Sequence, residues 1–360
     1  MELILILNNE VKLKQLLVIL ALILTLTNLS RSQSLEETLS NLSEDAGVAY
    51  VGPIISAFGS NMNSGWVNGV PSASILGLDI QIRLIAVGSF FNDDEKTFVT
   101  HGKFWFNSSN ADDILYTSGF DSISTPNYDD MRKEILSQSW NVDIGGPTII
   151  GRHDEDVKII FPGAVIQGDT IPSTITTLSG ASGFLDGISV FPTPAIQLNV
   201  GSIAGTSVSF RYFPTVNIGD VGEAGLWGLG ILHNIGFWFS NPLPLEIGLG
   251  YFYQDLDIGT VFQNKSNMFG IYASKTFGMI ISFEPYVGLT YETSKTKMQY
   301  TYNFDTPLGQ QSQSIDVDLD GQNSAGLTVG AQLNLPVVSL NVDYKIAKIK
   351  TLTVGLNLGF

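Results

Sequence analysis

Three aspartates at alternate positions are the residues of this chain that best match a known ion-binding pattern. They are Asp316, Asp318 and Asp320 in the segment DVDLDGQNS, which matches the first half of an EF-hand calcium loop. In such a loop, alternate carboxylates converge on one cation because the glycine that follows turns the chain. The twelfth position is Leu327 instead of the bidentate glutamate, and no flanking helices are indicated. The aspartates are therefore a weak calcium candidate, and a solvated loop is the favoured interpretation.

Other catalytic and metal-binding patterns are missing from the sequence. The histidines are scattered at His101, His153 and His233, and neither G-x-S-x-G nor H-E-x-x-H occurs. The chain has no cysteine, which excludes disulfides, thiolate metal sites and cysteine catalysis. A hydrolase stays open only because catalytic triads are assembled in space and not in sequence. We therefore expect neither an enzyme nor a bound cofactor.

Composition and charge narrow the class of protein further. The 360 residues include 18 Lys and Arg against 34 Asp and Glu, and the net charge of −16 argues against a nucleic-acid partner. A hydrophobic fraction of 44% with 14% charged residues is typical of a folded chain. The counts of 37 Gly, 21 Phe and 12 Tyr favour β-structure with aromatic belts over a helical bundle.

The N-terminus has the layout of a secretory signal peptide over residues 1–32. Lys12 and Lys14 precede an apolar run at 16–26, and a small-residue triplet ends at Ser32. A transmembrane anchor is the alternative interpretation, but a run of 11 residues, broken only by Thr25, is too short for a helix that needs about 20 to cross a bilayer. We therefore expect export of the mature chain.

Alternating hydrophobicity predicts many β-strands. From residue 75, Leu78, Ile80 and Ile82 fall on one face of a strand, while its other face carries Arg83. Nine further candidates follow at 195–201, 206–213, 225–237, 244–255, 268–277, 281–302, 326–335, 338–346 and 351–360. Residues 92–194 show no pattern from which an order of elements can be predicted.

Connection lengths distinguish a membrane barrel from a soluble sandwich. The linkers 202–205, 238–243, 278–280 and 336–337 are short and alternate with longer polar linkers at 214–224, 256–267 and 303–325, although the last linker on the second side, 347–350, is short too. This alternation is typical of outer-membrane barrels, whose apolar strand faces point outward to lipid. We therefore predict an all-β fold, an antiparallel transmembrane β-barrel of about 12 strands (range about 10 to 14) over residues 71–360. Its predicted lumen side chains are Arg83, Arg211, Glu246 and Gln332.

The segment 33–70 before the barrel has a helical pattern. Leu35, Leu39 and Leu42 recur at helical spacing, and a second apolar stretch is interrupted at Gly52-Pro53, where a break is expected. Such a segment either plugs the lumen or caps one end of the barrel, and the sequence does not decide between the two. The residues predicted to form the plug are Tyr50, Pro53, Ile54, Ile55 and Phe58.

The ending TVGLNLGF resembles the C-terminal targeting signal of bacterial outer-membrane barrels. Thr353, Gly355, Leu358 and Phe360 occupy the positions of that signal. The resemblance implies that the barrel-assembly machinery of the outer membrane is a partner. The segments GWVNGVPSASILGLDIQI, GTSVSFRYFPTVN and GLGILHNI also resemble an uncharacterised group of outer-membrane proteins from Bacteroidetes-type bacteria. The plug-like N-terminal segment is loosely similar to the long-chain fatty-acid transporter family, although no motif specific to that family occurs.

These observations predict an outer-membrane barrel in contact with lipid that passes or binds small solutes, hydrophobic ones among them. Two alternatives stay open. The first is a barrel without transport function that anchors or binds partners at the surface. The second is a soluble periplasmic β-protein that binds a ligand.

Overall fold

The computed structural model describes residues 35–178, 180–217, 222–241 and 243–359. The predicted signal peptide at 1–32 and the terminal Phe360 lie outside these residues. Two helices come first, α2 (Leu35–Ser40) and α3 (Glu44–Met62), as the helical spacing predicted. Among the described residues, no helix is long and apolar enough to span a bilayer.

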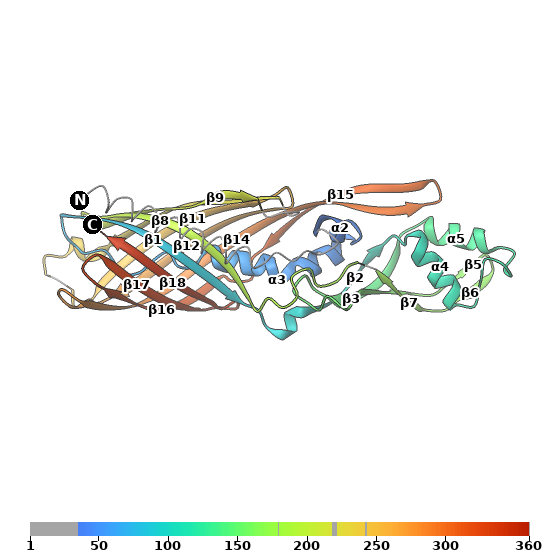
Figure 1. The fold of residues 1–360 in the computed structure, drawn as a ribbon, viewed down its shortest axis with the longest axis horizontal. Helices are drawn as coiled ribbons and strands as arrows, with labels where there is room; N and C mark the ends of the chain where they lie inside the picture. Colours follow the sequence, from blue (N-terminus) through green and yellow to red (C-terminus); the bar gives the residue numbers. More distant parts are fainter. Residues whose placement is uncertain (1–34, 179, 218–221, 242, 360) are drawn as a thin grey trace, which may run out of the picture. The chain divides into compact units, whose positions relative to one another are not determined.

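Within the described chain, ten antiparallel strands close a barrel, because β12 pairs with β14 (Figure 1). The ten are β1 (Leu76–Phe90), β8 (Val190–Ile203), β9 (Thr206–Asn217), β10 (Glu223–Asn234), β11 (Glu246–Ile258), β12 (Phe262–Ser274), β14 (Ser282–Thr306), β16 (Ala325–Asn334), β17 (Val338–Ile346) and β18 (Thr351–Gly359). Two more, β13 (Phe277–Gly278) and β15 (Gly309–Asp320), pair with the two ends of β14 and complete a sheet of 12 strands. The predicted all-β antiparallel barrel is thus confirmed.

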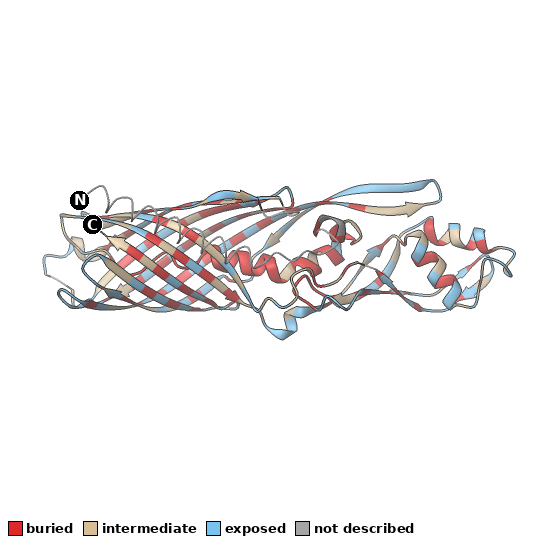
Figure 2. Cartoon of the chain, viewed as in Figure 1, coloured by how far each residue is buried: buried red, intermediate tan, exposed pale blue. Residues whose placement is uncertain are grey.

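Buried and exposed residues alternate along the strands of the barrel (Figure 2). Val208, Phe210 and Tyr212 on the outer face of β9 are 50%, 43% and 46% exposed. Arg211 between them is 1% exposed and points into the barrel. An apolar outer face over a polar interior is the pattern of barrels that are surrounded by lipid.

Two of the predicted long loops are instead strand extensions. The segment 256–267 contains only a turn at 259–261, because β11 continues to Ile258 and β12 begins at Phe262. Within 303–325, β14 and β15 form a hairpin. Tyr300 and Tyr302 explain the extension of β14, since both are 4% exposed and donate hydrogen bonds to the backbone of Leu42 and of Trp105 respectively.

The unassigned region forms an insert, residues 91–189, between β1 and β8. Its elements are η1 (Asp93–Lys96), β2 (Thr97–Phe104), α4 (Ser108–Thr117), α5 (Tyr128–Leu136), β3 (Trp140–Pro147), β4 (Val157–Phe161), β5 (Ala164–Ile166), β6 (Asp169–Ile171) and β7 (Thr174–Leu178). The sheet has the order β2-β3-β4-β7, and β5 pairs with β6. The insert follows Phe90, at the end of the barrel opposite the end of β18, where Gly359 pairs with Gln81.

Helix α3 continues through Pro53, so the predicted break at Gly52-Pro53 is wrong. A proline inside a helix removes one backbone hydrogen bond and costs roughly 3 kcal/mol. Here the helix is enclosed on most sides, with Tyr50, Ile54 and Phe58 all buried. Burial of each such side chain stabilises by about 1.5 to 3 kcal/mol, which together exceeds the cost of the proline.

The outer face provides a direct test of the membrane environment. Leu249 is 48% exposed on the outside of β11. Leu249→Arg is expected to lower the free energy of unfolding by about 2 to 4 kcal/mol if the residue lies at the bilayer midplane, and by less near an interface. Val99→Arg is the control, because Val99 is 86% exposed on β2 of the insert. Urea unfolding in liposomes measures the free energy of unfolding of both variants. An equal loss of stability in the two would contradict a lipid-facing β11.

Candidate functional site in the barrel lumen

The barrel interior is occupied by the chain's own N-terminal segment. Helix α3 contacts β1, β8, β12 and β14, and residues 63–75, here called the strap, lead from its end to β1. Hydrogen bonds join the strap to the wall in order along its length: Asn63 Nδ2 to Thr293 O (3.2 Å), Asn68 Nδ2 to Gln81 Oε1 (3.3 Å), Val70 N to Ser274 Oγ (3.1 Å), and Asn234 Nδ2 to Pro71 O (2.7 Å). The strap therefore runs through the lumen from α3 toward the start of β1.

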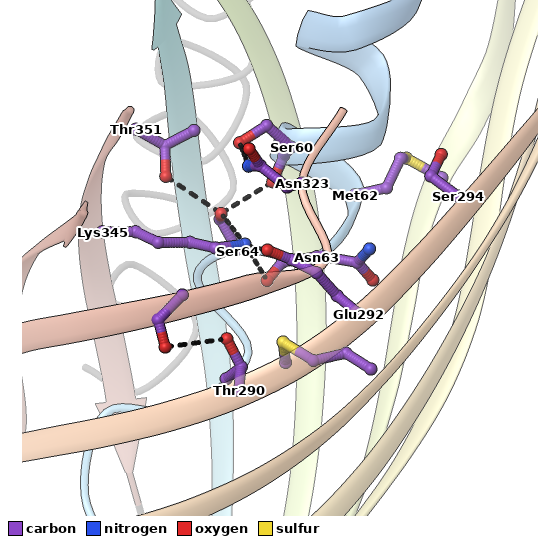
Figure 3. A network of polar contacts seen from close by, with 12 residues as sticks. Ser60, Met62, Asn63, Ser64, Thr290, Glu292, Ser294, Asn323, Lys345 and Thr351 are labelled. Atoms are coloured by element: carbon purple, nitrogen blue, oxygen red, sulfur yellow. Dashed lines mark hydrogen bonds and ion pairs between the residues drawn. The ribbon is translucent and has the colours of Figure 1, made fainter. Parts of the chain in front are cut away.

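Three buried cations of the wall bind backbone carbonyl groups where α3 ends. Lys345 Nζ donates to Asn63 O at 3.2 Å, and Figure 3 shows this lysine beside Ser64 and Glu292. Arg211 Nη1 donates to Ser64 O at 3.1 Å, and Arg83 Nη1 donates to Trp66 O at 2.9 Å. These carbonyl groups belong to the first residues of the strap, just after the C-terminus of α3, whose partial negative charge also favours cations nearby.

The two arginines complete their hydrogen bonds with neutral side chains. Arg83 donates to Asn357 Oδ1 at 3.0 Å and to Asn341 Oδ1 at 3.3 Å. Arg211 donates to Gln197 Oε1 at 2.9 Å and to Gln254 Oε1 at 3.1 Å. Lys345 differs, because its ammonium group forms an ion pair with Glu292 in which both side chains are almost fully buried.

The other predicted lumen residues lie toward the end of the barrel at which β18 ends. Gln332 is 5% exposed, and its Oε1 accepts hydrogen bonds from Asn68 Nδ2 and Asn357 Nδ2. Glu246, at the start of β11, is half-buried and accepts a hydrogen bond from Asn234 Nδ2. The structure thus places Arg83, Arg211 and Gln332 around the strap, and Glu246 at the rim.

Trp66 anchors the strap among apolar and glycine residues. Its ring lies 3.9 Å from the guanidinium carbon of Arg211 and 5.1 Å from the ring of Phe252, between centroids. A Cβ atom at Gly228 would stand 2.9 Å from the Trp66 ring, so a larger residue there would displace it. The surrounding cluster comprises Trp66, Val67, Val70, Leu232, Phe252, Met268 and Tyr272.

The predicted plug residues are all buried, and they contact two different parts of the protein. Phe58 packs edge-on against Phe191 at the start of β8, with 4.9 Å between ring centroids. Tyr50 instead contacts the insert, because its hydroxyl donates to Ser182 O at 2.7 Å and its carbonyl accepts from Ile149 N at 3.0 Å. The full set is Tyr50, Pro53, Ile54, Ile55 and Phe58. Helix α3 therefore links the barrel interior to the core of the insert.

The predicted targeting residues are divided between the two faces of β18. Thr353 and Gly355 face the lumen, where a Cβ atom on Gly355 would collide with Asn341. Leu358 has the opposite parity along the strand and is partly exposed. Phe360 lies outside the described residues. The targeting role of these positions stays a prediction.

The aspartates of the calcium-like pattern lie on a strand and not in a loop. Asp316 and Asp318 in β15 line a cleft of about 520 Å³ together with Asp257 and Lys297. Along an extended strand, alternate carboxylates lie side by side on one face and do not converge as in an EF-hand loop. Among the residues that the structure describes, no three acidic or histidine side chains are placed to hold a metal ion.

The histidines form separate pairs. His101 Nδ1 lies 2.8 Å from Asp143 Oδ1, and His153 Nδ1 lies 2.6 Å from Asp186 Oδ2, both on the exposed surface of the insert. The hydrogen bond with His153 holds the pKa of Asp186 below its usual range. His233 contacts Thr206 at the opposite end of the barrel. The structure therefore brings no two histidines together.

The strand pairing and the filled lumen define the class of this protein, an antiparallel β-barrel closed around its own N-terminal segment. Its sequence matches the model of a family of unknown function, DUF6588, over residues 12–360, and the chain belongs to that family. No curated protein matches the chain.

Solved structures with similarity to the chain include three β-barrels. Ail, the attachment invasion locus protein of Yersinia pestis, is 12% identical over 43% of this chain and 96% of its own, with a TM-score of 0.20. The N-terminal barrel domain of Pseudomonas aeruginosa OprF is 17% identical over 43% and 94%, with a TM-score of 0.19. OmpT, an outer-membrane protein of Vibrio cholerae, is 7% identical over 79% and 97%, with a TM-score of 0.24. The fold assignment rests on the chain's own strand pairing.

Proposed function

We propose that this protein is an outer-membrane barrel that binds and passes a small solute, and that residues 35–75 are its gate in the closed position. The observation that carries the proposal is the contact between the strap and the wall, in which Lys345, Arg211 and Arg83 each donate to a backbone carbonyl. Barrels of about eight strands are filled by wall side chains alone. Here a separate segment fills the wider interior, and its removal would leave a polar channel.

Location in the outer membrane is supported by the apolar exterior. Outward-facing Ile271, Leu289 and Val329 on neighbouring strands are each more than half exposed. A soluble periplasmic protein with an apolar surface of this extent would aggregate or bind a partner. The proposed partners are therefore outer-membrane lipid and the assembly machinery that would read the ending at Phe360. Resemblance to fatty-acid transporter barrels stays a prediction, and no enzymatic activity is proposed.

Surface binding of a partner is the second candidate function. The observation that favours it is the shared core of α3 and the insert, in which Tyr50, Phe106 and Ile149 are buried together. A plug that is fixed to the insert in this way is suited to support a surface domain, and the same barrel would then serve as an anchor. The two functions differ in whether the lumen opens.

Conductance across planar bilayers distinguishes the two functions. We expect the full-length wild type to conduct little. A variant carrying Trp66→Ala and a protease site inserted after the exposed Ser72 is expected to open after cleavage, because the strap then loses both its anchor and its covalent link to β1. A rise in single-channel conductance together with release of the N-terminal fragment would support the gate.

Trp105→Ala with the same protease site is the matched control, since Trp105 stacks on Phe304 at 4.9 Å, away from the strap. Cleavage of this variant should leave the conductance unchanged. If the Trp66→Ala barrel stays folded, releases the fragment and conducts no more than wild type, transport is refuted and surface binding becomes the leading function. Retention of the strand fold is checked by the heat-dependent shift in electrophoretic mobility.

A further inference from the structure

We infer that the solute is an organic anion with an apolar body about as large as an aromatic ring, and that it binds where Ser64 to Trp66 of the strap now lie. This inference rests on the proposed gate function. It names the class of solute from the groups that the strap contacts in the wall. Three features carry it: the donors around the strap, the balance of charge, and the pocket that holds the Trp66 ring.

The donors around the strap converge on oxygen atoms. The Trp66 carbonyl oxygen accepts from Arg83 Nη1 at 2.9 Å and from Gln197 Nε2 at 3.0 Å. Two residues earlier, Ser64 O accepts from Arg211 Nη1 at 3.1 Å. A carboxylate or phosphate oxygen would meet the same donors with a full negative charge. An anionic oxygen would add the attraction between opposite charges to the hydrogen bonds that the two arginines now make with neutral carbonyl groups.

The charges nearest the two arginines also favour an anion. Glu292 pairs with Lys345, and Asp343 accepts from the Tyr286 hydroxyl at 2.9 Å, whereas Glu284 lies farther along the strap beside Gly69. Within the described chain, neither Arg83 nor Arg211 has a carboxylate within ion-pair distance, although both are at most 1% exposed. A buried charge is stabilised by a counter-charge, so an anion gains more from this site than a neutral solute.

The pocket beside the two arginines fits an apolar group. The Trp66 ring lies between Arg211, at 3.9 Å, and Phe252, at 5.1 Å between centroids. Gly230 lies beside Phe252 and Trp66, where an added Cβ atom would approach both rings. A solute ring could replace the Trp66 ring in this position and stack on Arg211 in the same way. The wall thus offers anion donors and an apolar pocket side by side.

A matched pair of probes tests the inference on the full-length Trp66→Ala protein, in which the space of the Trp66 ring beside Arg211 is free. The carboxylate of a probe then competes with the carbonyl groups of residues 64 and 66 for the two arginines. Indole-3-acetate and indole-3-acetamide have nearly the same shape, and only the first is an anion. We expect calorimetric titration in detergent to show the acid binding roughly tenfold more tightly than the amide. Arg83→Gln with Arg211→Gln, added to Trp66→Ala, should abolish that preference. Arg152→Gln, which changes an exposed arginine of the insert, should leave it intact.

Equal affinity for the acid and the amide would overturn the inference, and so would the absence of binding by either probe. The comparison of the two probes needs no arginine substitution, so it stands even if the double arginine variant fails to fold. Conductance of the cleaved barrel is recorded separately. A barrel that opens and shows no preference for the acid refutes only the anionic solute. A barrel that binds the acid and never opens refutes only the passage of solute through the lumen.

Discussion

Lys345→Met is expected to lower the free energy of unfolding by about 3 to 5 kcal/mol, the cost of breaking a buried ion pair by removing one partner. Lys345 and Glu292 have 1% and 0% of their side-chain surface exposed, and the lysine is the cation that Glu292 contacts. The same ammonium donates to Asn63 O at 3.2 Å and to Ser64 Oγ at 3.4 Å. Its loss therefore leaves a buried carboxylate uncompensated and also weakens the hold on the strap.

A double variant separates these effects, because Glu292→Gln removes the charge that Lys345→Met leaves behind. The double variant should recover most of the stability, since replacing both partners of a buried pair is often close to neutral. Lys297→Met, at an exposed position of the same strand β14, should change little. Urea unfolding in detergent micelles gives the free energy of unfolding of the wild type, Lys345→Met, the double variant and Lys297→Met. A double variant as unstable as Lys345→Met would show that the buried charge is not the cause.

The strands of the barrel were predictable because each follows a two-residue period with a strong contrast between its faces. The segment 244–255 was expected and β11 spans Glu246–Ile258, with Leu249 outside as predicted. In barrels that cross a membrane, this contrast arises because lipid accepts only apolar side chains on the outer face, whereas the interior retains polar ones. The difference between the two faces of each strand therefore appears in the local sequence as an alternation of apolar and polar residues.

The strand extensions and the continuous α3 were not predictable in the same way. Asp, Gln and Asn in 303–325 resemble a loop by composition. Tyr300 and Tyr302 are held by the turn between α2 and α3 and by the insert respectively, and both partners are distant in sequence. Pro53 indicates a break locally, and only the packing of distant segments around α3 offsets it. Tertiary contacts that override a local preference cannot be found from a short sequence window.

The sequence predicted the arginines of the candidate site but not the groups that they bind. Arg83 and Arg211 were assigned to the lumen by parity along their strands, and they lie there. Their most informative partners are the carbonyl oxygens of Trp66 and Ser64. Every residue has a backbone carbonyl, so no residue type marks these acceptors. The strap also lacks a periodic pattern because it is neither helix nor strand, and its role depends on its position inside the barrel.

Phe58→Ala is expected to loosen α3 and the insert together while the barrel wall stays intact. Phe58 is 5% exposed and packs on Phe191 and Phe262, so its truncation should cost about 3 to 5 kcal/mol. Because α3, the insert and the adjoining ends of β8 and β12 share one apolar core, the loss should appear as faster amide hydrogen exchange in residues 44–62, in the insert and at those two strand ends. The strands β16 to β18 should keep the exchange rates of the wild type.

Phe269→Ala is the matched control for the removal of a ring, because Phe269 is 57% exposed on the outer face of β12. It should leave exchange in the insert unchanged, and any effect should be confined to the wall around β12. If Phe58→Ala instead accelerates exchange in β16 to β18 as much as in α3, the plug and the wall open as one cooperative unit. A gate must move while the strands of the barrel wall stay paired, so that result would contradict the proposed gate. Surface binding by a barrel with a fixed plug would then be the better supported function.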